Sequence, residues 1–443
     1  MAYWYRRVFA LAIPLILSNL TQPLLSTVDT VLSGHLPGAA ALGGVAMGGI
    51  FFNGIFWTFG FLRISTTGLV AQAYGAQRHD ELRLHFLRGL GAAAAIGVLV
   101  LLVQTPLIAI SVHMLGASPE VALNAKLYCH LRIWSAPAAL ANYVILGYML
   151  GRQRARTALA LQAAINVVNV AMALWLVVHL HWGVAGIACA TMLADWSGCA
   201  LGLLLASNAL HPESAGERSI RWAELLDRPS VLRLLALNRD IFLRTISLVA
   251  AYAWFTRTGA RESDAVLAAN AILMNMFFIV SYGLDGFANA TEALVGAAVG
   301  AQRLVDYRAV LRASNLAAFV VSAIASLAYI AGGSHLIGLF TNQEPVRILA
   351  LRYLPWVMAL PVLSVWAFQL DGVFIGATRA RELRNAMLLS FAVFLALAIV
   401  LERTMGNNGL WCAFCAFIVL RGVSLSFYLP RIEADFPIPA PVS

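Results

Sequence analysis

Long apolar stretches recur along the whole chain, and short polar segments separate them. Most of the stretches reach or exceed the roughly 20 residues that an α-helix needs to cross a bilayer. The pattern predicts an all-α integral membrane protein with twelve transmembrane helices. These are predicted over residues 8–33, 40–73, 85–112, 120–150, 157–180, 184–206, 234–256, 264–298, 309–332, 346–376, 384–402 and 409–430.

The two halves of the chain resemble each other at an offset of 225 residues. Residues 66–78 (TTGLVAQAYGAQR) and 291–303 (TEALVGAAVGAQR) agree at eight of thirteen positions, and GYMLGRQRAR from Gly147 matches GVFIGATRAR from Gly372 at five of ten. Six spans per copy give both copies the same orientation in the membrane. The pattern therefore predicts two six-helix bundles related by a pseudo-twofold axis along the membrane normal, an architecture typical of secondary transporters.

The longest polar stretch separates these two copies. We expect an N-lobe over residues 1–207, a cytoplasmic linker over 208–233 and a C-lobe over 234–443. The short basic start of the chain precedes a span-length apolar run without a cleavage motif, so the first helix is expected to be retained.

Composition and charge placement agree with a membrane protein. Hydrophobic residues make up 61% of the chain and charged residues 12%, against about 25% charged in soluble proteins. The net charge of +9 does not indicate a nucleic-acid partner, because 19 of the 30 Lys and Arg residues lie at the termini or in alternate loops. By the positive-inside rule, both termini are expected to be cytoplasmic, in the inner membrane of a bacterium.

The first span carries an acidic residue, Asp29, and a carboxylate at membrane depth costs at least about 2.5 kcal/mol. Asn166 and Asn169 share one face of the fifth span, and Thr191 and Asp195 share one face of the sixth. Together these groups offer oxygen ligands for a monovalent cation and a carboxylate that can bind a proton. Alternatively, Asp29 is a structural hydrogen-bonding partner, and the Asn and Thr side chains hold helices together.

Pro14 and Pro23 each remove a backbone hydrogen bond from the first span, so this helix can bend more easily than its neighbours. Bending there would couple proton or ion binding at Asp29 to a change of helix shape. Static kinks are the alternative.

The second half contains its own set of charged residues inside or beside the spans. Since buried charges usually pair, we interpret them mainly as a structural and gating network rather than as direct substrate contacts. The set comprises Arg239, Asp240, Asp285, Glu292, Asp371 and Arg421.

Several other classes of function are disfavoured. Cys412 and Cys415 form a C-x-x-C pair, but no further metal ligands lie at suitable spacing. The sequence has neither an H-E-x-x-H motif nor a nucleophile elbow, and no re-entrant segment resembles a channel filter. We therefore expect no enzyme activity, no resident metal and no organic cofactor.

Several segments resemble the DinF branch of the multidrug and toxic compound extrusion (MATE) transporters. They read AIPLILSNLTQPLLSTVDTVLSGHL, FLRISTTGLVAQAYGA, LALNRDIFLR, YGLDGFANATEALVGAAVGA and LDGVFIGATRARELRN. The resemblance implies twelve helices in two lobes and drug efflux driven by proton or sodium entry.

Carried over by position, the resemblance assigns the cation-site aspartate to Asp29, the bending proline to Pro14, and the site asparagine and threonine to Asn169 and Thr191. Many relatives place a second aspartate where this chain has Ala173. A hard cation prefers anionic oxygen ligands, whereas protonation needs only one carboxylate. The sequence therefore favours H+ as the coupling ion over Na+.

The leading hypothesis is an antiporter, acting as a monomer in the lipid bilayer, that exports small amphipathic and cationic organic molecules. Two alternatives are sodium-coupled drug efflux and a lipid-linked oligosaccharide flippase of the same superfamily. A flippase needs arginines to bind the pyrophosphate, and the first half has only Arg63 and Arg132 inside its spans.

Overall fold

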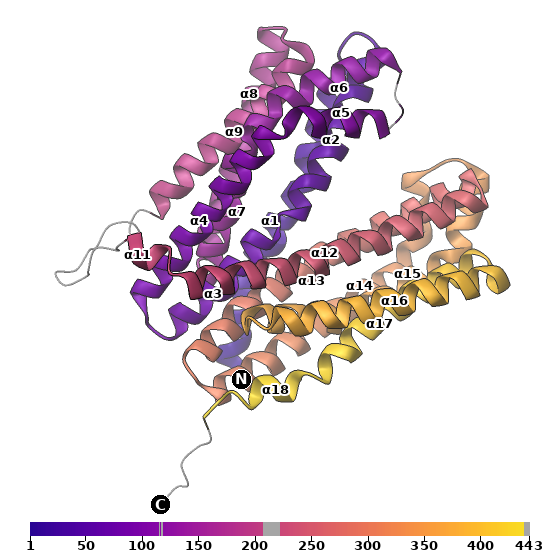
Figure 1. Cartoon of the computed structure of the whole chain (residues 1–443). Helices are drawn as coiled ribbons and strands as arrows, with labels where there is room; N and C mark the ends of the chain where they lie inside the picture. The colour runs from indigo at the N-terminus through magenta and orange to yellow at the C-terminus, as the bar shows by residue number, and fades with distance from the viewer. Residues whose placement is uncertain (115, 117, 207–221, 438–443) are drawn as a thin grey trace, which may run out of the picture. The chain divides into compact units, whose positions relative to one another are not determined.

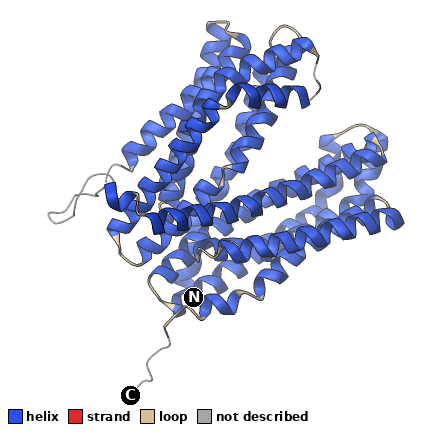
Figure 2. Cartoon of the chain, viewed as in Figure 1, coloured by secondary structure: helices blue, strands red, loops and turns tan. Residues whose placement is uncertain are grey.

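The computed structural model describes every residue except 115, 117, 207–221 and 438–443, and it also leaves the side chains of residues 22–26, 114 and 222 undescribed. Over the described residues the protein is built of helices joined by short connections, and no strand is present among them (Figure 2). Most of the predicted linker, and the side chain of Pro23, lie outside this described part.

The first half begins with one long helix and continues with shorter segments that pair end to end (Figure 1). Predicted span 40–73, for example, is formed by two helices that meet at Phe59 and Gly60. The segments are α1 (Ala2–Gly34), α2 (Ala39–Thr58), α3 (Phe61–Gly75), α4 (His79–Leu102), α5 (Gln104–Met114), α6 (Pro119–Arg132), η1 (Ile133–Ser135), α7 (Ala136–Gly151), α8 (Ala155–Leu174), η2 (Trp175–His179) and α9 (Gly183–Leu205).

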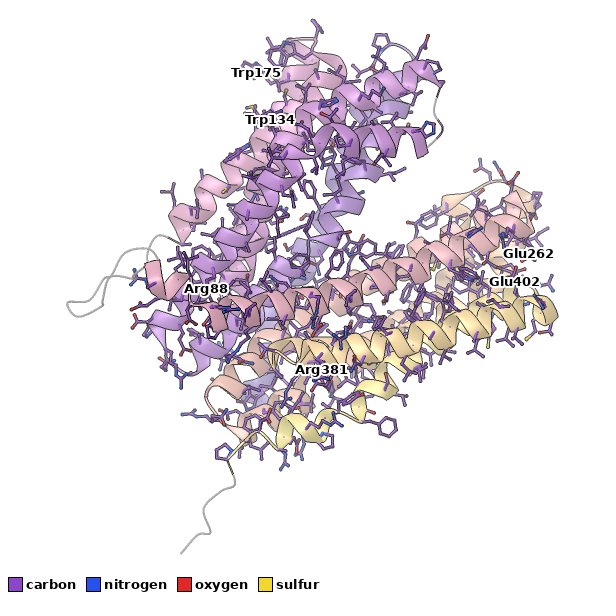
Figure 3. All side chains as sticks on the ribbon, in the orientation of Figure 1. Arg88, Trp134, Trp175, Glu262, Arg381 and Glu402 are labelled. Carbon is purple, nitrogen blue, oxygen red and sulfur yellow. The ribbon has the colours of Figure 1, made fainter. Side chains whose placement is uncertain are left out.

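In the second half the corresponding segments are mostly continuous helices. They are α11 (Trp222–Leu225), α12 (Arg228–Glu262), α13 (Asp264–Gly300), α14 (Leu304–Phe340), α15 (Glu344–Gly376), α16 (Ala380–Met405), α17 (Asn407–Ser426) and α18 (Leu429–Glu433). The short helix α11 is held by Arg88 of α4, whose guanidinium donates to the carbonyl oxygens of Glu224 at 2.6 Å and Leu225 at 3.1 Å (Figure 3).

Ten helical segments within the described residues are long and apolar enough to cross a membrane. The two predicted spans outside this set lie in α1, which contains the undescribed side chains, and α12, which carries Arg239, Asp240 and Arg244. Both helices are as long as the other spans, at 33 and 35 residues.

The internal repeat is visible in the backbone. Helices α2, α4, α6 and α8 start 225 residues before α13, α14, α15 and α16. The connections repeat as well: Gln77 and Gln302 have φ of 57° and 54°, and the next amide in each, at Arg78 and Arg303, bonds to a carbonyl five residues back at 3.0 Å. Such left-handed turns with a 6→1 bond end helices and redirect the chain.

Glycines explain why the motif of the second repeat is shared. A Cβ atom on Gly147 of α7 would lie 2.6 Å from the Arg63 carbonyl oxygen of α3, and one on Gly372 of α15 would lie 2.3 Å from that of Ala288 on α13. Only glycine permits this backbone approach, which is how small-xxx-small motifs pack helices in membranes. One turn further on, Gly151 approaches the Thr67 carbonyl and Gly376 that of Glu292 in the same way.

The chain divides into two compact units, one comprising residues 17–74 and 78–234, the other 1–16, 75–77 and 235–443. The first turns of α1 therefore pack with the second half, whereas the sequence placed residues 1–207 together in the N-lobe. Val8 and Ala12 are fully buried, and the rings of Phe9 and Phe287 make an edge contact at 5.7 Å. Gly286 provides the space for Ile16, since a Cβ on this glycine would lie 2.3 Å from the isoleucine side chain.

Candidate functional site

Asp29 lies on the part of α1 that belongs to the unit of residues 17–74 and 78–234. Its side chain is buried, with 7% of the residue exposed, and its Oδ1 has no hydrogen-bond partner among the described residues. A buried carboxylate oxygen without a partner is costly, because it has lost water and gained nothing in return. The oxygen is therefore available to bind a proton or a cation.

Asn169 of α8 and Thr191 of α9 are brought together as a buried pair. The Asn169 amide donates to the Thr191 hydroxyl at 3.0 Å, and this hydroxyl lies 3.3 Å from the Ile187 carbonyl oxygen to which it donates. The amide oxygen of Asn169 is buried and has no partner in the described part of the chain. The pair thus presents a second acceptor oxygen inside the same unit.

An apolar cluster places α1 beside α8 and α9 near these polar groups. Leu32, one turn after Asp29, packs against Ala173 of α8 and Ala190 of α9. Ala173 is fully buried in this cluster, so the position at which many relatives carry a second acid is occupied by a methyl group in apolar contact.

The two remaining predicted residues of this half have other partners. Asn166 accepts a hydrogen bond from Gln162 one turn earlier on α8, at 3.2 Å. Asp195 of α9 is partly buried, and its backbone carbonyl accepts from the Asn142 amide at 2.9 Å. Asn142 therefore ties α7 to α9 next to the Asp195 side chain.

Arg132, the last residue of α6, is a member of this site that the sequence reasoning did not assign to it. It lies within electrostatic range of both Asp29 and Asp195, although no nitrogen–oxygen pair within 4.0 Å joins it to either described carboxylate. An arginine inside a span was the available signal, because an intramembrane charge is by default a functional candidate.

In the second half, Asp371 of α15 is held by two arginines. It accepts from Arg421 of α17 at 2.7 Å and from Arg244 of α12, and all three side chains are largely buried. Arg244 was not among the residues predicted for this network. Tyr252 of α12 lies within electrostatic range of this triad and of Asp285.

Asp240 of α12 forms a separate group. It accepts from the neighbouring Arg239 at 3.0 Å and from Arg384 of α16 at 2.6 Å. Glu292 of α13 is almost fully buried, with 1% exposed, where its backbone meets Gly376. Pro14 is buried within α1, which remains helical from Ala2 to Gly34.

These features define the class of protein. A chain of membrane-spanning helices, repeated at a fixed offset and enclosing buried charged and amide side chains, is a polytopic membrane transporter. The MatE family model matches residues 14–175 and 241–401, one segment in each half. The chain belongs to the MatE family, the multidrug and toxic compound extrusion transporters.

Curated relatives agree with this membership. The chain is 41% identical to DNA damage-inducible protein F of Escherichia coli (strain K12) over 425 residues, covering 95% of this chain and 91% of that protein. It is 24% identical to multidrug and toxin extrusion protein 1 of Homo sapiens, covering 97% of this chain and 75% of that protein. The predicted resemblance to the DinF branch of this family is confirmed.

Solved structures show the same fold. A transporter of the MOP superfamily from Pyrococcus furiosus superposes with a TM-score of 0.86 at 18% identity, over 98% of this chain and 97% of that one. A multidrug resistance MATE family transporter in an outward-facing conformation superposes with a TM-score of 0.85, also at 18% identity, over 98% and 96%. The predicted twelve-span, two-lobe fold is confirmed.

Proposed function

We propose that this protein is an antiporter that exports small amphipathic, cationic organic compounds in exchange for protons, with Asp29 as the proton-binding group. The observation that carries the proposal is the buried Oδ1 of Asp29, which has no hydrogen-bond partner among the described residues. The substrate class is supported by relatives named as multidrug resistance and multidrug extrusion proteins.

The surroundings of Asp29 favour a proton over sodium. A sodium ion would need several oxygen ligands with negative charge among them, and the position of a second family acid is Ala173, which is packed against Leu32 and Ala190. A proton needs only one carboxylate oxygen. Sodium coupling is the second candidate, because the unpartnered amide oxygen of Asn169 could serve as a ligand.

Pro14 supports a link between proton binding and a change of shape. It lies three residues before Leu17, where α1 passes from one compact unit to the other. Protonation of Asp29 would remove a buried charge from the same helix, and the missing backbone hydrogen bond at Pro14 makes bending there less costly than elsewhere. The arrangement of arginines in the sequence supports cytoplasmic termini, and we propose that the protein resides in a bacterial cytoplasmic membrane.

The test is the substitution Asp29→Asn, which keeps the shape of the side chain and removes its proton exchange. In proteoliposomes with an imposed pH gradient, efflux of an ethidium-like dye should be lost, since the variant can no longer release a proton. Asn166→Ala is the matched control, because Asn166 is in the same bundle but bonds to Gln162, and it should retain efflux. Undiminished proton-driven efflux by Asp29→Asn would refute the role of Asp29, and wild-type efflux driven by sodium alone would favour the second candidate.

A further inference from the structure

We propose that Arg132 is a tethered cation for the carboxylates of this site, standing electrostatically where a sodium ion would otherwise be required. In this role it makes the site exchange protons and reject sodium. The inference rests on the proposed function and adds to it the residue that determines ion selectivity.

Arg132 is held in place by aromatic side chains. Its Nη1 donates to the Tyr128 hydroxyl at 2.6 Å, and its guanidinium lies 4.6 Å from the centroid of the Phe52 ring. Tyr128 and Phe52 are each only 1% exposed. Gly48 of α2 makes room for the tyrosine, since a Cβ on this glycine would lie 2.2 Å from the ring. A guanidinium that is hydrogen-bonded and stacked on buried rings is a charge fixed in position.

The charge of Arg132 acts on carboxylates from two other helices. Asp29 of α1 and Asp195 of α9 both lie within its electrostatic range, so one positive charge faces two acids. Neither acid is locked to it, because no nitrogen–oxygen distance of 4.0 Å or less joins them. Tyr128, Cys129 and Tyr143 also lie in electrostatic range of Arg132, as Arg63 does of Tyr143.

This arrangement separates sodium from protons by simple electrostatics. A fixed guanidinium lowers the negative potential at the acids and repels a second cation in a medium of low dielectric constant. A metal ion depends on that potential, because it must be bound by several oxygens at once. A proton instead bonds directly to one carboxylate oxygen, such as the unpartnered Oδ1 of Asp29, and it neutralises the charge at its source.

The chain contains a matched control for Arg132. Arg152 makes the same contact to a tyrosine one turn earlier, with 2.7 Å from its Nη1 to the Tyr148 hydroxyl and 5.4 Å from its guanidinium to the ring centroid. Arg152 is not among the groups that act on Asp29 or Asp195. Replacing it removes an equivalent arginine–tyrosine pair and leaves the charge of the site unchanged.

The experiment compares wild type with Arg132→Gln, Arg132→Lys and Arg152→Gln, each purified and reconstituted. Binding of radioactive sodium and dye efflux driven by a sodium gradient at constant pH are measured. We expect Arg132→Gln to bind sodium at least about tenfold more tightly than wild type and to gain sodium-driven efflux. Arg132→Lys, which keeps the charge, and Arg152→Gln should both behave as wild type does.

A folded Arg132→Gln protein that binds sodium no better than wild type would overturn the inference, and so would an equal gain in Arg152→Gln. If Arg132→Gln does not fold, Tyr128→Phe replaces it. This variant keeps the ring and frees the guanidinium, and the inference then requires a measurable gain in sodium binding. Sodium-driven efflux by the wild type would refute the proposed function itself, so the two failures are distinguishable.

Discussion

Gly372 provides the sharpest test of how the repeated helix pairs are packed. In the substitution Gly372→Ala, the new methyl group would lie 2.3 Å from the carbonyl oxygen of Ala288 and 3.0 Å from its carbon. Ordinary contact begins at 3.4 Å, so α15 and α13 must separate locally by 3.4 − 2.3 = 1.1 Å. The obstacle is backbone, which cannot rotate away as a side chain can.

The expected cost follows from two opposing terms. Overpacking a close interface costs typically about 1–3 kcal/mol, whereas alanine in place of glycine favours a helix by roughly 0.5–1 kcal/mol. We expect a net loss of about 1–2 kcal/mol, which corresponds to roughly a tenfold shift in the folding equilibrium. Gly147→Ala, at the equivalent position of the first half, meets the Arg63 carbonyl oxygen at 2.6 Å and should cost somewhat less.

The assay is the half-life of the monodisperse protein in detergent at a fixed elevated temperature, because membrane proteins commonly unfold irreversibly. Gly332→Ala in α14 is the control, since its methyl group would meet nothing within 4 Å. Gly372→Ala should shorten the half-life several-fold, and Gly332→Ala should not. Equal half-lives for the two variants would refute the claim that backbone contact at Gly372 governs this packing.

Two further predictions concern buried polar contacts. Asp371→Asn removes the carboxylate between Arg244 and Arg421, and breaking a buried ion pair costs about 3–5 kcal/mol. Its half-life should fall below that of Gly372→Ala, and an unchanged half-life would show that the triad is not a stabilising unit. For the bond between Asn169 and Thr191, a double-mutant cycle of Asn169→Ala and Thr191→Val should give a coupling of about 0.6–1.7 kcal/mol, measured as unfolding free energy. Additive effects would contradict it.

The sequence determined the fold class and the repeat, because hydropathy and residue identity are local properties. A span needs only enough consecutive apolar residues, and the offset of 225 residues recurs in the helix starts and in the turns at Gln77 and Gln302. Even the glycines of the second repeat motif were visible as letters. The reason for them, the approach of Gly147 and Gly372 to opposing carbonyl oxygens, needed the packed helices.

The partners of individual polar side chains were decided only by the tertiary structure. Of the two asparagines on one face of α8, Asn169 bonds across to Thr191, while Asn166 bonds along its own helix to Gln162. In the second half, Asn270 and Asn407 exchange amide hydrogen bonds at 2.8 and 2.9 Å across 137 residues, with no preceding signal in the pattern.

The same holds for charge. The sequence identified Asp29 as a costly carboxylate, but it could not show that Arg132 of α6 reaches the field of Asp29 and of Asp195, or that Arg244 binds Asp371. Spacing along a chain determines which residues share one helix face. Which faces of different helices meet depends on the packing of the whole unit, so the composition of the ion site belongs to the tertiary structure alone.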